Sequence, residues 1–262
     1  MTIDRRALKA EAREHMRTAT PRPVYEGLLF VLLSGAFFYI SGRLLSAQID
    51  VDEMIQYMNY LGSGSYAQAV KLAEKLQPTT ADYLVSTVLQ LFQSFASAGF
   101  SLFALRSLRG DESCSLWNLF DGFGVFSPLL LVLILTRLLT MLWLQLLVIP
   151  GLIAFYRYRL AVYLVLDHPR LGGFRAILLS GGMMHGHKGQ LFALDLSFAG
   201  WFLLALLPYA ASLFAPGLPL RILGALGSAV LFAGLATYHR LSCTLFYEKL
   251  RAAAEEAAAE IT

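Results

Sequence analysis

The sequence predicts an all-helical, polytopic membrane protein with six transmembrane helices and both termini in the cytoplasm. Of its 262 residues, 57% are hydrophobic and only 15% are charged. The mean hydropathy is +0.59, and several windows of membrane-spanning length carry no charge. A soluble chain of this size has too little interior to hide so much apolar surface from water. The composition therefore disfavours a soluble enzyme, a disordered chain and a disulfide-stapled secreted domain.

The first two and last two spans follow from uncharged windows, because a helix crosses the hydrocarbon layer in about 20 residues. Residues 27–42 and 83–105 are uncharged, which predicts spans at about 24–45 and 82–105. The last two spans are predicted at about 189–214 and 220–240. Pro216, Gly217 and Pro219 punctuate the sequence between them and predict a short turn.

The middle of the chain, residues 122–166, is long enough for one span or two. Two spans at about 126–148 and 151–166, joined by a turn at Pro150-Gly151, place fourteen Lys and Arg residues inside and four outside. A single span gives ten inside and eleven outside. Since cytoplasmic loops are rich in Lys and Arg, we favour two spans here and six in the whole chain.

The connecting segments complete a membrane domain at residues 24–246. Residues 1–23 form a basic amphipathic segment that orients the chain by its charge or rests on anionic lipid. A cleaved signal peptide is a weaker alternative for the first span. Residues 47–81 predict an external pair of amphipathic helices, with an extracellular binding module as the alternative. Residues 167–188 form a cytoplasmic interfacial loop, and residues 247–262 form a cytoplasmic tail helix.

Four charged residues fall at bilayer depth, where ionisable side chains are costly and are functional candidates by default. From the helical rise, Asp195 lies roughly 9 Å and Arg159 roughly 10 Å from the cytoplasmic ends of their helices. An ion pair of Asp195 with Arg159 or Arg157 lets both charges sit there. Arg137 lies near the midplane and requires carbonyl groups, water or a ligand anion. We therefore predict an intramembrane ion pair or anion site.

The second span carries a polar face, which we expect to look into the bundle. Hydrogen bonding between helices is the simpler interpretation of such a face, and a path for a solute is the alternative. The residues that form it are Ser86, Gln90, Gln93, Ser94 and Ser97, continued by Ser101.

The glycine-rich stretch before the fifth span predicts a re-entry loop or a headgroup-binding loop. The second interpretation uses Arg175, Gly186, His187 and Lys188 to bind a phosphate or a lipid headgroup. His185 and His187 alone are too few for a metal site, so no metal is expected. We find no hydrolase or metalloprotease motif and no other catalytic set, and therefore expect no enzyme activity and no cofactor.

The region from Ile149 to Trp201 carries a distinctive series of motifs. They are Pro150-Gly151, Tyr158, Tyr163, Asp167-His168-Pro169, Met184 to Lys188 and Leu194 to Trp201. With these motifs the region closely resembles a bacterial membrane-protein family that is known only as domain of unknown function nine-seven-five. A more distant similarity is to the membrane domain of some glycerophosphodiester phosphodiesterases. The family carries no assigned activity, so the resemblance supports the architecture and leaves the function open.

These observations predict a multi-pass protein of the plasma membrane that acts as a non-enzymatic helper. It is expected to bind membrane lipid, with a protein partner or a second copy of the chain as another partner and no nucleic acid. The predicted binding rim at the cytoplasmic leaflet consists of Arg157, Arg159, Arg175, Lys188 and Asp195. A small-solute or ion transporter is the alternative function. Cys114 and Cys243 both fall on the cytoplasmic side and are expected to stay reduced.

Overall fold

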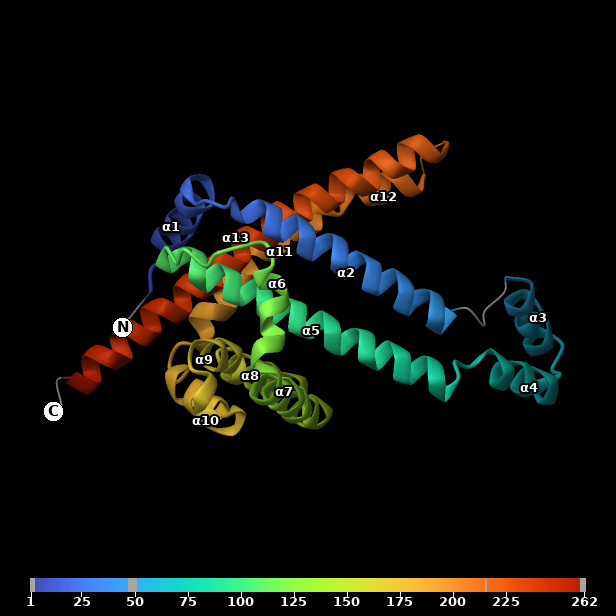
Figure 1. Cartoon of the computed structure of the whole chain (residues 1–262). Helices are drawn as coiled ribbons and strands as arrows, with labels where there is room; N and C mark the ends of the chain where they lie inside the picture. The colour runs from blue at the N-terminus through green and yellow to red at the C-terminus, as the bar shows by residue number, and fades with distance from the viewer. Residues whose placement is uncertain (1–2, 47–50, 215, 260–262) are drawn as a thin grey trace. The chain divides into compact units, whose positions relative to one another are not determined.

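A computed structural model describes residues 3–46, 51–214 and 216–259. The structure is 86% helical, and its described residues contain no strand. Six helices are long and apolar enough to cross a membrane (Figure 1). The predicted all-helical class and the number of spans are therefore confirmed. The chain divides into two compact units, residues 1–31 with 95–262 (unit 1) and residues 32–94 (unit 2).

Unit 2 contains the second half of α2 (Pro23–Ser46) and the first half of α5 (Thr80–Arg109). Between them lie two short helices, α3 (Val51–Gly62) and α4 (Tyr66–Leu76). Gly64 turns the chain between α3 and α4 with a φ of 72°, a conformation that suits glycine. The predicted helix pair is thus present, while residues 47–50 of the predicted external loop lie outside the described residues.

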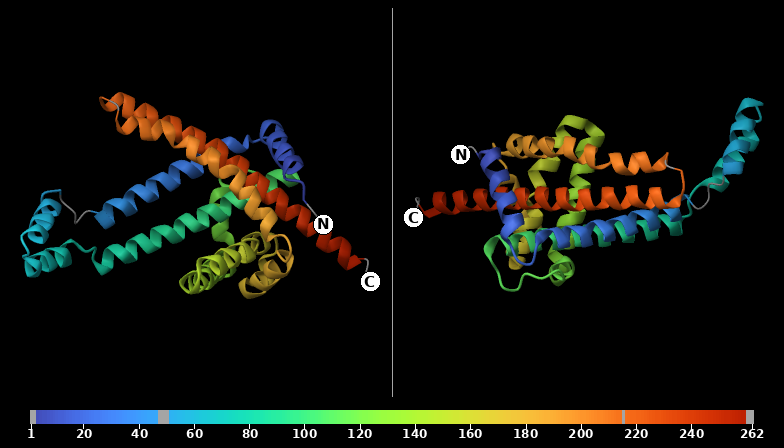
Figure 2. Two further views of the ribbon diagram at one scale, coloured as in Figure 1. Left: turned by 180° about the vertical axis from the view of Figure 1, so that it is seen from behind. Right: turned by 90° about the horizontal axis from the view of Figure 1, so that it is seen from above.

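Unit 1 begins with α1 (Arg5–Thr18), an amphipathic helix that packs against α13 (Leu218–Ala259) (Figure 2). Leu8 and Ala12 are buried in this contact. His15 Nε2 lies 2.8 Å from Ser107 Oγ, and burial lowers the pKa of its imidazole. The apolar side of the basic amino-terminal segment therefore faces the protein, while its arginines remain exposed.

The middle of the chain forms a helical hairpin. It comprises α6 (Asn118–Asp121), η1 (Gly122–Val125), α7 (Phe126–Leu146), α8 (Val148–Tyr158) and α9 (Ala161–Asp167). The turn lies at Leu147, whose backbone is extended, and not at Pro150-Gly151 as predicted. Pro150 instead occupies the first turn of α8, where its missing N–H costs no helical hydrogen bond. The two-span interpretation holds, with the turn displaced toward the amino terminus.

The remaining elements are η2 (Pro169–Leu171), α10 (Gly173–Met183), α11 (Lys188–Ala205), α12 (Leu207–Leu213) and α13. Helix α13 runs without interruption for 42 residues, so residues 247–259, which the sequence predicted to form a tail helix, continue the helix of the last span. The sequence after Tyr247 is rich in alanine and charged residues, which favour helix as strongly as the residues of the span before it. No residue there ends the helix.

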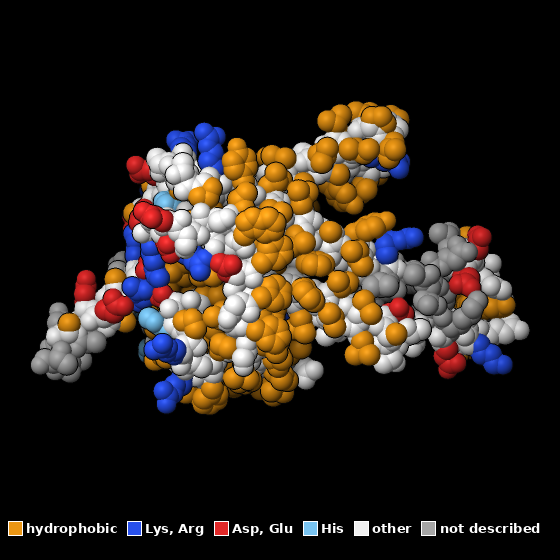
Figure 3. All heavy atoms as spheres, viewed as in Figure 1, with side chains coloured by type: hydrophobic (Ala, Val, Ile, Leu, Met, Phe, Trp, Pro, Cys, Tyr) orange, Lys and Arg blue, Asp and Glu red, His pale blue; other side chains and the backbone are white. Residues whose placement is uncertain are grey.

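Close contacts between backbones hold unit 1 together. A Cβ added at Gly99 on α5 would lie 1.9 Å from the carbonyl oxygen of Leu119. Between α9 and α13, the rings of Tyr163 and Tyr247 stack at 5.2 Å. Charged side chains gather at the end of unit 1 that carries α1, and hydrophobic side chains cover the face beside it (Figure 3). That distribution suits a helical bundle surrounded by lipid at its middle.

Candidate functional site

Three segments of unit 1 bring five polar side chains together, which we call the Asp195 cluster. Its members are Tyr156, Arg159, Asp195, His239 and Cys243. Tyr156 lies on α8 and Arg159 directly after it, Asp195 lies on α11, and the last two residues lie on α13. Because residues four apart share one face of a helix, His239 and Cys243 both face Asp195.

The two oxygens of Asp195 have different partners. Oδ2 forms an ion pair with Arg159 and accepts a hydrogen bond from the Tyr156 hydroxyl at 2.9 Å. Oδ1 lies 2.8 Å from Nε2 of His239 and 4.0 Å from Sγ of Cys243. The sulfur is in turn 3.6 Å from His239 Nε2 and 3.6 Å from Nη2 of Arg159. One side of the cluster thus carries the Arg159 guanidinium and the Tyr156 hydroxyl. The other side carries three atoms that can act as metal ligands: Asp195 Oδ1, His239 Nε2 and Cys243 Sγ.

Apolar and aromatic groups surround the cluster. The ring of Phe198 meets His239 edge-on at 5.1 Å, and the Arg159 guanidinium lies 5.6 Å from the centroid of Phe155. Cys243 is buried, while the side chains of Asp195 and His239 retain exposures of 19% and 22%. Within the described residues, Asp195, His239 and Cys243 are the group that could hold a metal ion.

A second polar group, the Asp167 cluster, joins α5, α9 and a later part of α13. Arg109 donates two hydrogen bonds to Asp167, at 2.6 and 2.9 Å. Arg251 and the Tyr247 hydroxyl donate to the same carboxylate at 2.7 and 2.9 Å. Glu248 completes the cluster by accepting from Arg109 at 2.9 Å. Arginine forks and a hydroxyl saturate the buried carboxylate, which is typical of a structural connection.

Exposed cations surround α10, and we call this group the α10 rim: Arg157, Arg170, Arg175 and Lys188. Arg170 precedes α10, Arg175 lies in its first turn, and Lys188 begins the next helix. The guanidinium of Arg157 lies across α10 at Gly181, where an added Cβ would be 3.0 Å from Nε. Three of them are exposed and Lys188 is half-buried.

The predicted intramembrane set is only partly brought together. Arg159 and Asp195 form the ion pair that the sequence suggested. Arg157 lies instead over α10, because its position on α8 points away from Asp195. Arg137 lies on α7 with an exposed side chain. A single site containing all four residues is therefore not observed.

The loop before α11 contains the other predicted binding residues. Gly186 is exposed and has a φ of 80°, and His187 is the residue that precedes α11. Nδ1 of His187 is buried and forms no hydrogen bond within the described chain. His185 is exposed, so the two histidines differ in environment.

The polar face of the second span is used mainly for hydrogen bonds inside the protein. Ser97 and Ser101 accept from Arg240 at 2.9 and 2.8 Å. Gln93 donates to Ser34 at 2.5 Å within unit 2. The hydroxyls of Ser86 and Ser94 donate to backbone carbonyls of their own helix, and Gln90 is exposed. These contacts agree with the simpler interpretation of the face.

Sequence reasoning missed Tyr156, His239 and Cys243. The spacing of His239 and Cys243 is the signal that could have found them, but it has meaning only once α11 is known to lie opposite. Glu26 on α2 was also missed. Its side chain is completely buried.

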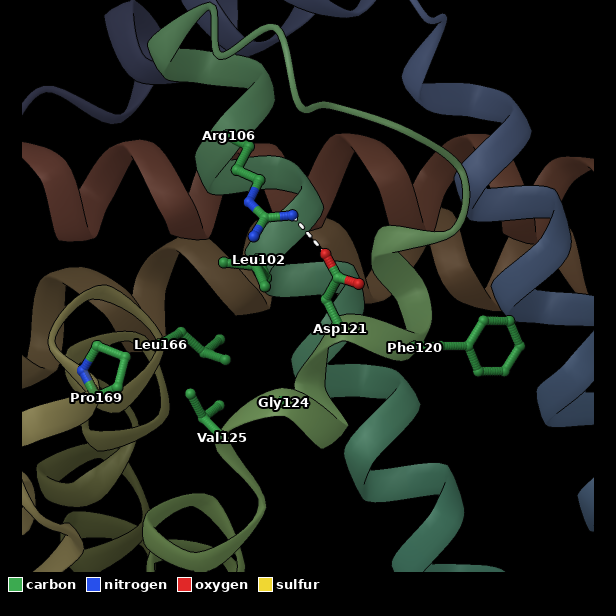
Figure 4. A pocket seen from close by; sticks show the side chains of 8 residues that line it. All are labelled: Leu102, Arg106, Phe120, Asp121, Gly124, Val125, Leu166 and Pro169. Carbon is green, nitrogen blue, oxygen red and sulfur yellow. Dashed lines mark hydrogen bonds and ion pairs between the residues drawn. The ribbon is translucent and has the colours of Figure 1, made fainter.

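An open pocket of 410 Å³ lies between α5, the η1 region and the end of α9. Its polar groups are Arg106 and Asp121, which pair with each other (Figure 4). Leu102, Val125 and Leu166 supply apolar wall. Since the two charges already neutralise one another, the pocket offers little for a polar ligand.

Comparison with known families finds a match over residues 144–254 to the family described as Protein of unknown function (DUF975). The predicted resemblance to this family is confirmed. The matched region contains the entire Asp195 cluster and the α10 rim. No curated protein and no solved structure matches the chain, and the more distant similarity to the phosphodiesterase membrane domain is not shown.

Proposed function

We propose that this protein is a non-enzymatic component of the plasma membrane that binds anionic lipid headgroups through the α10 rim. The observation that carries the proposal is that one short helix, α10, exposes apolar side chains and one cation and is flanked by the other cations of the rim. Phe174 and Leu178 are 60% and 59% exposed, and Arg175 is exposed beside them. A helix with this pattern lies in the interface, with its apolar side chains in the acyl region and its cations at headgroup depth.

The charge balance of this end of unit 1 supports the proposal. In the described part of the chain, no acidic side chain forms an ion pair with Arg157, Arg170, Arg175 or Lys188. The nearby acids have other partners, since Asp167 and Glu248 pair with Arg109, and Asp195 pairs with Arg159. The cations of the rim are therefore free of internal neutralisation and available to an anion.

The orientation predicted by the positive-inside rule places this end at the cytoplasmic leaflet, which carries anionic lipid. Each Lys or Arg near such a surface contributes about 1 kcal/mol of attraction. Three neutralised side chains therefore predict a loss of affinity of up to about 100-fold.

Transport of a small solute has less support. The serines of the inner half of α5 that could line a path are engaged by Arg240, and the arginine is held over the Phe100 ring at 5.2 Å. A path would have to break these contacts at each passage.

Lipid retention by the detergent-extracted protein tests the proposal. The Arg157→Gln, Arg175→Gln, Lys188→Gln triple variant is compared with wild type by native mass spectrometry, after addition of phosphatidylglycerol or phosphatidylcholine. We expect the variant to lose bound phosphatidylglycerol and to bind phosphatidylcholine as wild type does. The matched control neutralises Arg43 and Lys71, which are exposed and predicted to lie on the external side, and it should retain phosphatidylglycerol as wild type does. Equal phosphatidylglycerol retention by the rim variant and wild type would contradict the proposal.

A further inference from the structure

We propose that Asp195, His239 and Cys243 form a binding site for a divalent cation of the zinc class. This site differs from the lipid-binding rim in its residues and in its ligand, so it goes beyond the proposed function. The three side chains come from α11 and α13 and are brought together by the packing of these two helices.

The types of donor atom favour zinc. The cluster offers one carboxylate oxygen, one imidazole nitrogen and one sulfur. Zinc accepts this mixture, whereas calcium and magnesium take oxygen ligands and copper(I) prefers sulfur. The donor set therefore selects a borderline-soft divalent ion.

The spacing of the donors also fits. Tetrahedral zinc holds nitrogen and oxygen ligands at about 2.0–2.1 Å and sulfur at about 2.3 Å, so ligand atoms lie about 3.3–3.5 Å apart. In the structure, Asp195 Oδ1 is 2.8 Å from His239 Nε2 and 4.0 Å from Cys243 Sγ. The nitrogen and sulfur are 3.6 Å apart. Shifts of about half an ångström convert this triangle into one face of a tetrahedron.

The rest of the cluster holds the donors in position. Arg159 and Tyr156 both bind Oδ2 of Asp195, which fixes the carboxylate and leaves Oδ1 directed at the other two donors. Hydrogen bonds of this kind to the far oxygen of a ligand commonly orient it and raise metal affinity. Arg159 Nη2 also donates to Cys243 Sγ at 3.6 Å, so the same guanidinium contacts two of the three ligands.

The charges balance with a divalent ion. Ionised Asp195 and thiolate Cys243 carry two negative charges, which the metal neutralises. The remaining positive charge of Arg159 favours an anion, such as hydroxide, at the fourth position. Three protein ligands with one open position are characteristic of zinc sites that bind a further group.

A catalytic thiol explains the arrangement less well. In a nucleophilic triad, the histidine uses one ring nitrogen for the nucleophile and the other for the carboxylate. Here Nε2 of His239 faces both Asp195 Oδ1 and Cys243 Sγ. Convergence of three donors on one point is what a metal ion requires.

Part of the cluster lies at the surface of the protein. The side chains of Asp195 and His239 retain 19% and 22% exposure, so the cluster is not sealed. Asp195 is seven residues from Lys188, the first residue of α11, which places it about 10 Å along the helix from that end. This depth is within the outer part of a span.

Cobalt(II) binding to the full-length protein in detergent tests the inference, because a cobalt–thiolate bond produces a charge-transfer absorption. The protein is freed of purification tags and treated with chelator, and cobalt is then titrated alone. We expect one equivalent per chain with the thiolate absorption, and displacement of cobalt by zinc. Cys114→Ser is the matched control, since burial raises the pKa of that thiol and it lies outside the cluster. It should bind cobalt as wild type does.

Cys243→Ser should abolish the thiolate absorption and lower cobalt affinity by at least tenfold. His239→Gln should also lose stoichiometric binding. Because either variant could destabilise the bundle, helical content and thermal unfolding are measured beside the titration, and only folded protein is scored. Absence of stoichiometric binding in wild type would overturn the inference. Persistence of the absorption in Cys243→Ser, or its loss in Cys114→Ser, would do the same.

Discussion

The Asp167 and Asp195 clusters are both built around one aspartate, and they differ in what surrounds it. Asp167 receives hydrogen bonds from two arginines and a tyrosine, and its side chain is only 6% exposed. Asp195 has one arginine and one tyrosine on its Oδ2, while its Oδ1 faces a histidine and a cysteine. The first carboxylate is fully used by the fold, and the second keeps one oxygen among groups that bind metals. The comparison separates a structural connection from a candidate binding site.

Removing the charge of Asp167 should have the largest effect. Asp167→Asn leaves Arg109 and Arg251 without their shared carboxylate, at side-chain exposures of 36% and 30%. Loss of one partner of a buried pair costs about 3–5 kcal/mol, and the partial exposure of both arginines reduces this to about 2–3 kcal/mol. Thermal unfolding in detergent measures the loss. Glu255→Gln, which removes an exposed partner of Arg251, should cost less than about 0.5 kcal/mol. Similar losses for both variants would contradict the structural role of Asp167.

Zinc should separate the two clusters by stabilising only one of them. At a free concentration 100 times the dissociation constant, a ligand of the folded state adds about 2.7 kcal/mol to the free energy of unfolding. Zinc should therefore raise the Tm of wild type and of Asp167→Asn, and leave that of Asp195→Asn unchanged. If zinc raised the Tm of Asp195→Asn as much as that of wild type, the ion would have to bind outside the Asp195 cluster.

The tyrosines provide a matched pair of smaller changes. Tyr156 and Tyr247 each donate one hydroxyl hydrogen bond to an aspartate Oδ2, both at 2.9 Å. Replacing either by Phe should cost about 1 kcal/mol of stability. Only Tyr156→Phe should weaken cobalt binding, by about tenfold, because only this hydroxyl orients a metal ligand. Equal effects on cobalt affinity would show that the Tyr156 hydroxyl does not position Asp195.

The smallest effect should come from pH at a group outside both clusters. Burial lowers the pKa of His15, and the nearby Glu11 opposes this less strongly. The folded state therefore favours the neutral ring, so stability is complete above the ordinary pKa of about 6.5. The contribution of His15 to stability falls as the pH drops below that value, until His15 is protonated in the folded protein as well. The difference in Tm between wild type and His15→Gln should thus narrow on acidification from pH 7.5 to 5.5. A difference in Tm that stays constant over this pH range would contradict the lowered pKa of His15.

The sequence could predict what depends on composition and local spacing. Uncharged windows and the distribution of Lys and Arg gave six spans, and helical spacing gave the pair α3 and α4. Depth in the bilayer brought Arg159 and Asp195 to the same level, and the structure pairs them. The contribution of Cys243 and His239 could not be predicted, because it requires knowing which face of α13 meets α11. The turn at Leu147 was displaced because proline is tolerated in the first turn of a helix.

Helix α13 carries residues of both clusters and fixes the distance between them. His239 of the Asp195 cluster and Tyr247 of the Asp167 cluster are eight residues apart on this uninterrupted helix, or about 12 Å of helical rise. The ring of Tyr163 on α9 stacks on that of Tyr247. His239 and Tyr247 cannot approach one another unless helical hydrogen bonds of α13 break. A displacement of this part of α13 along its axis would therefore move one residue of each cluster by the same amount.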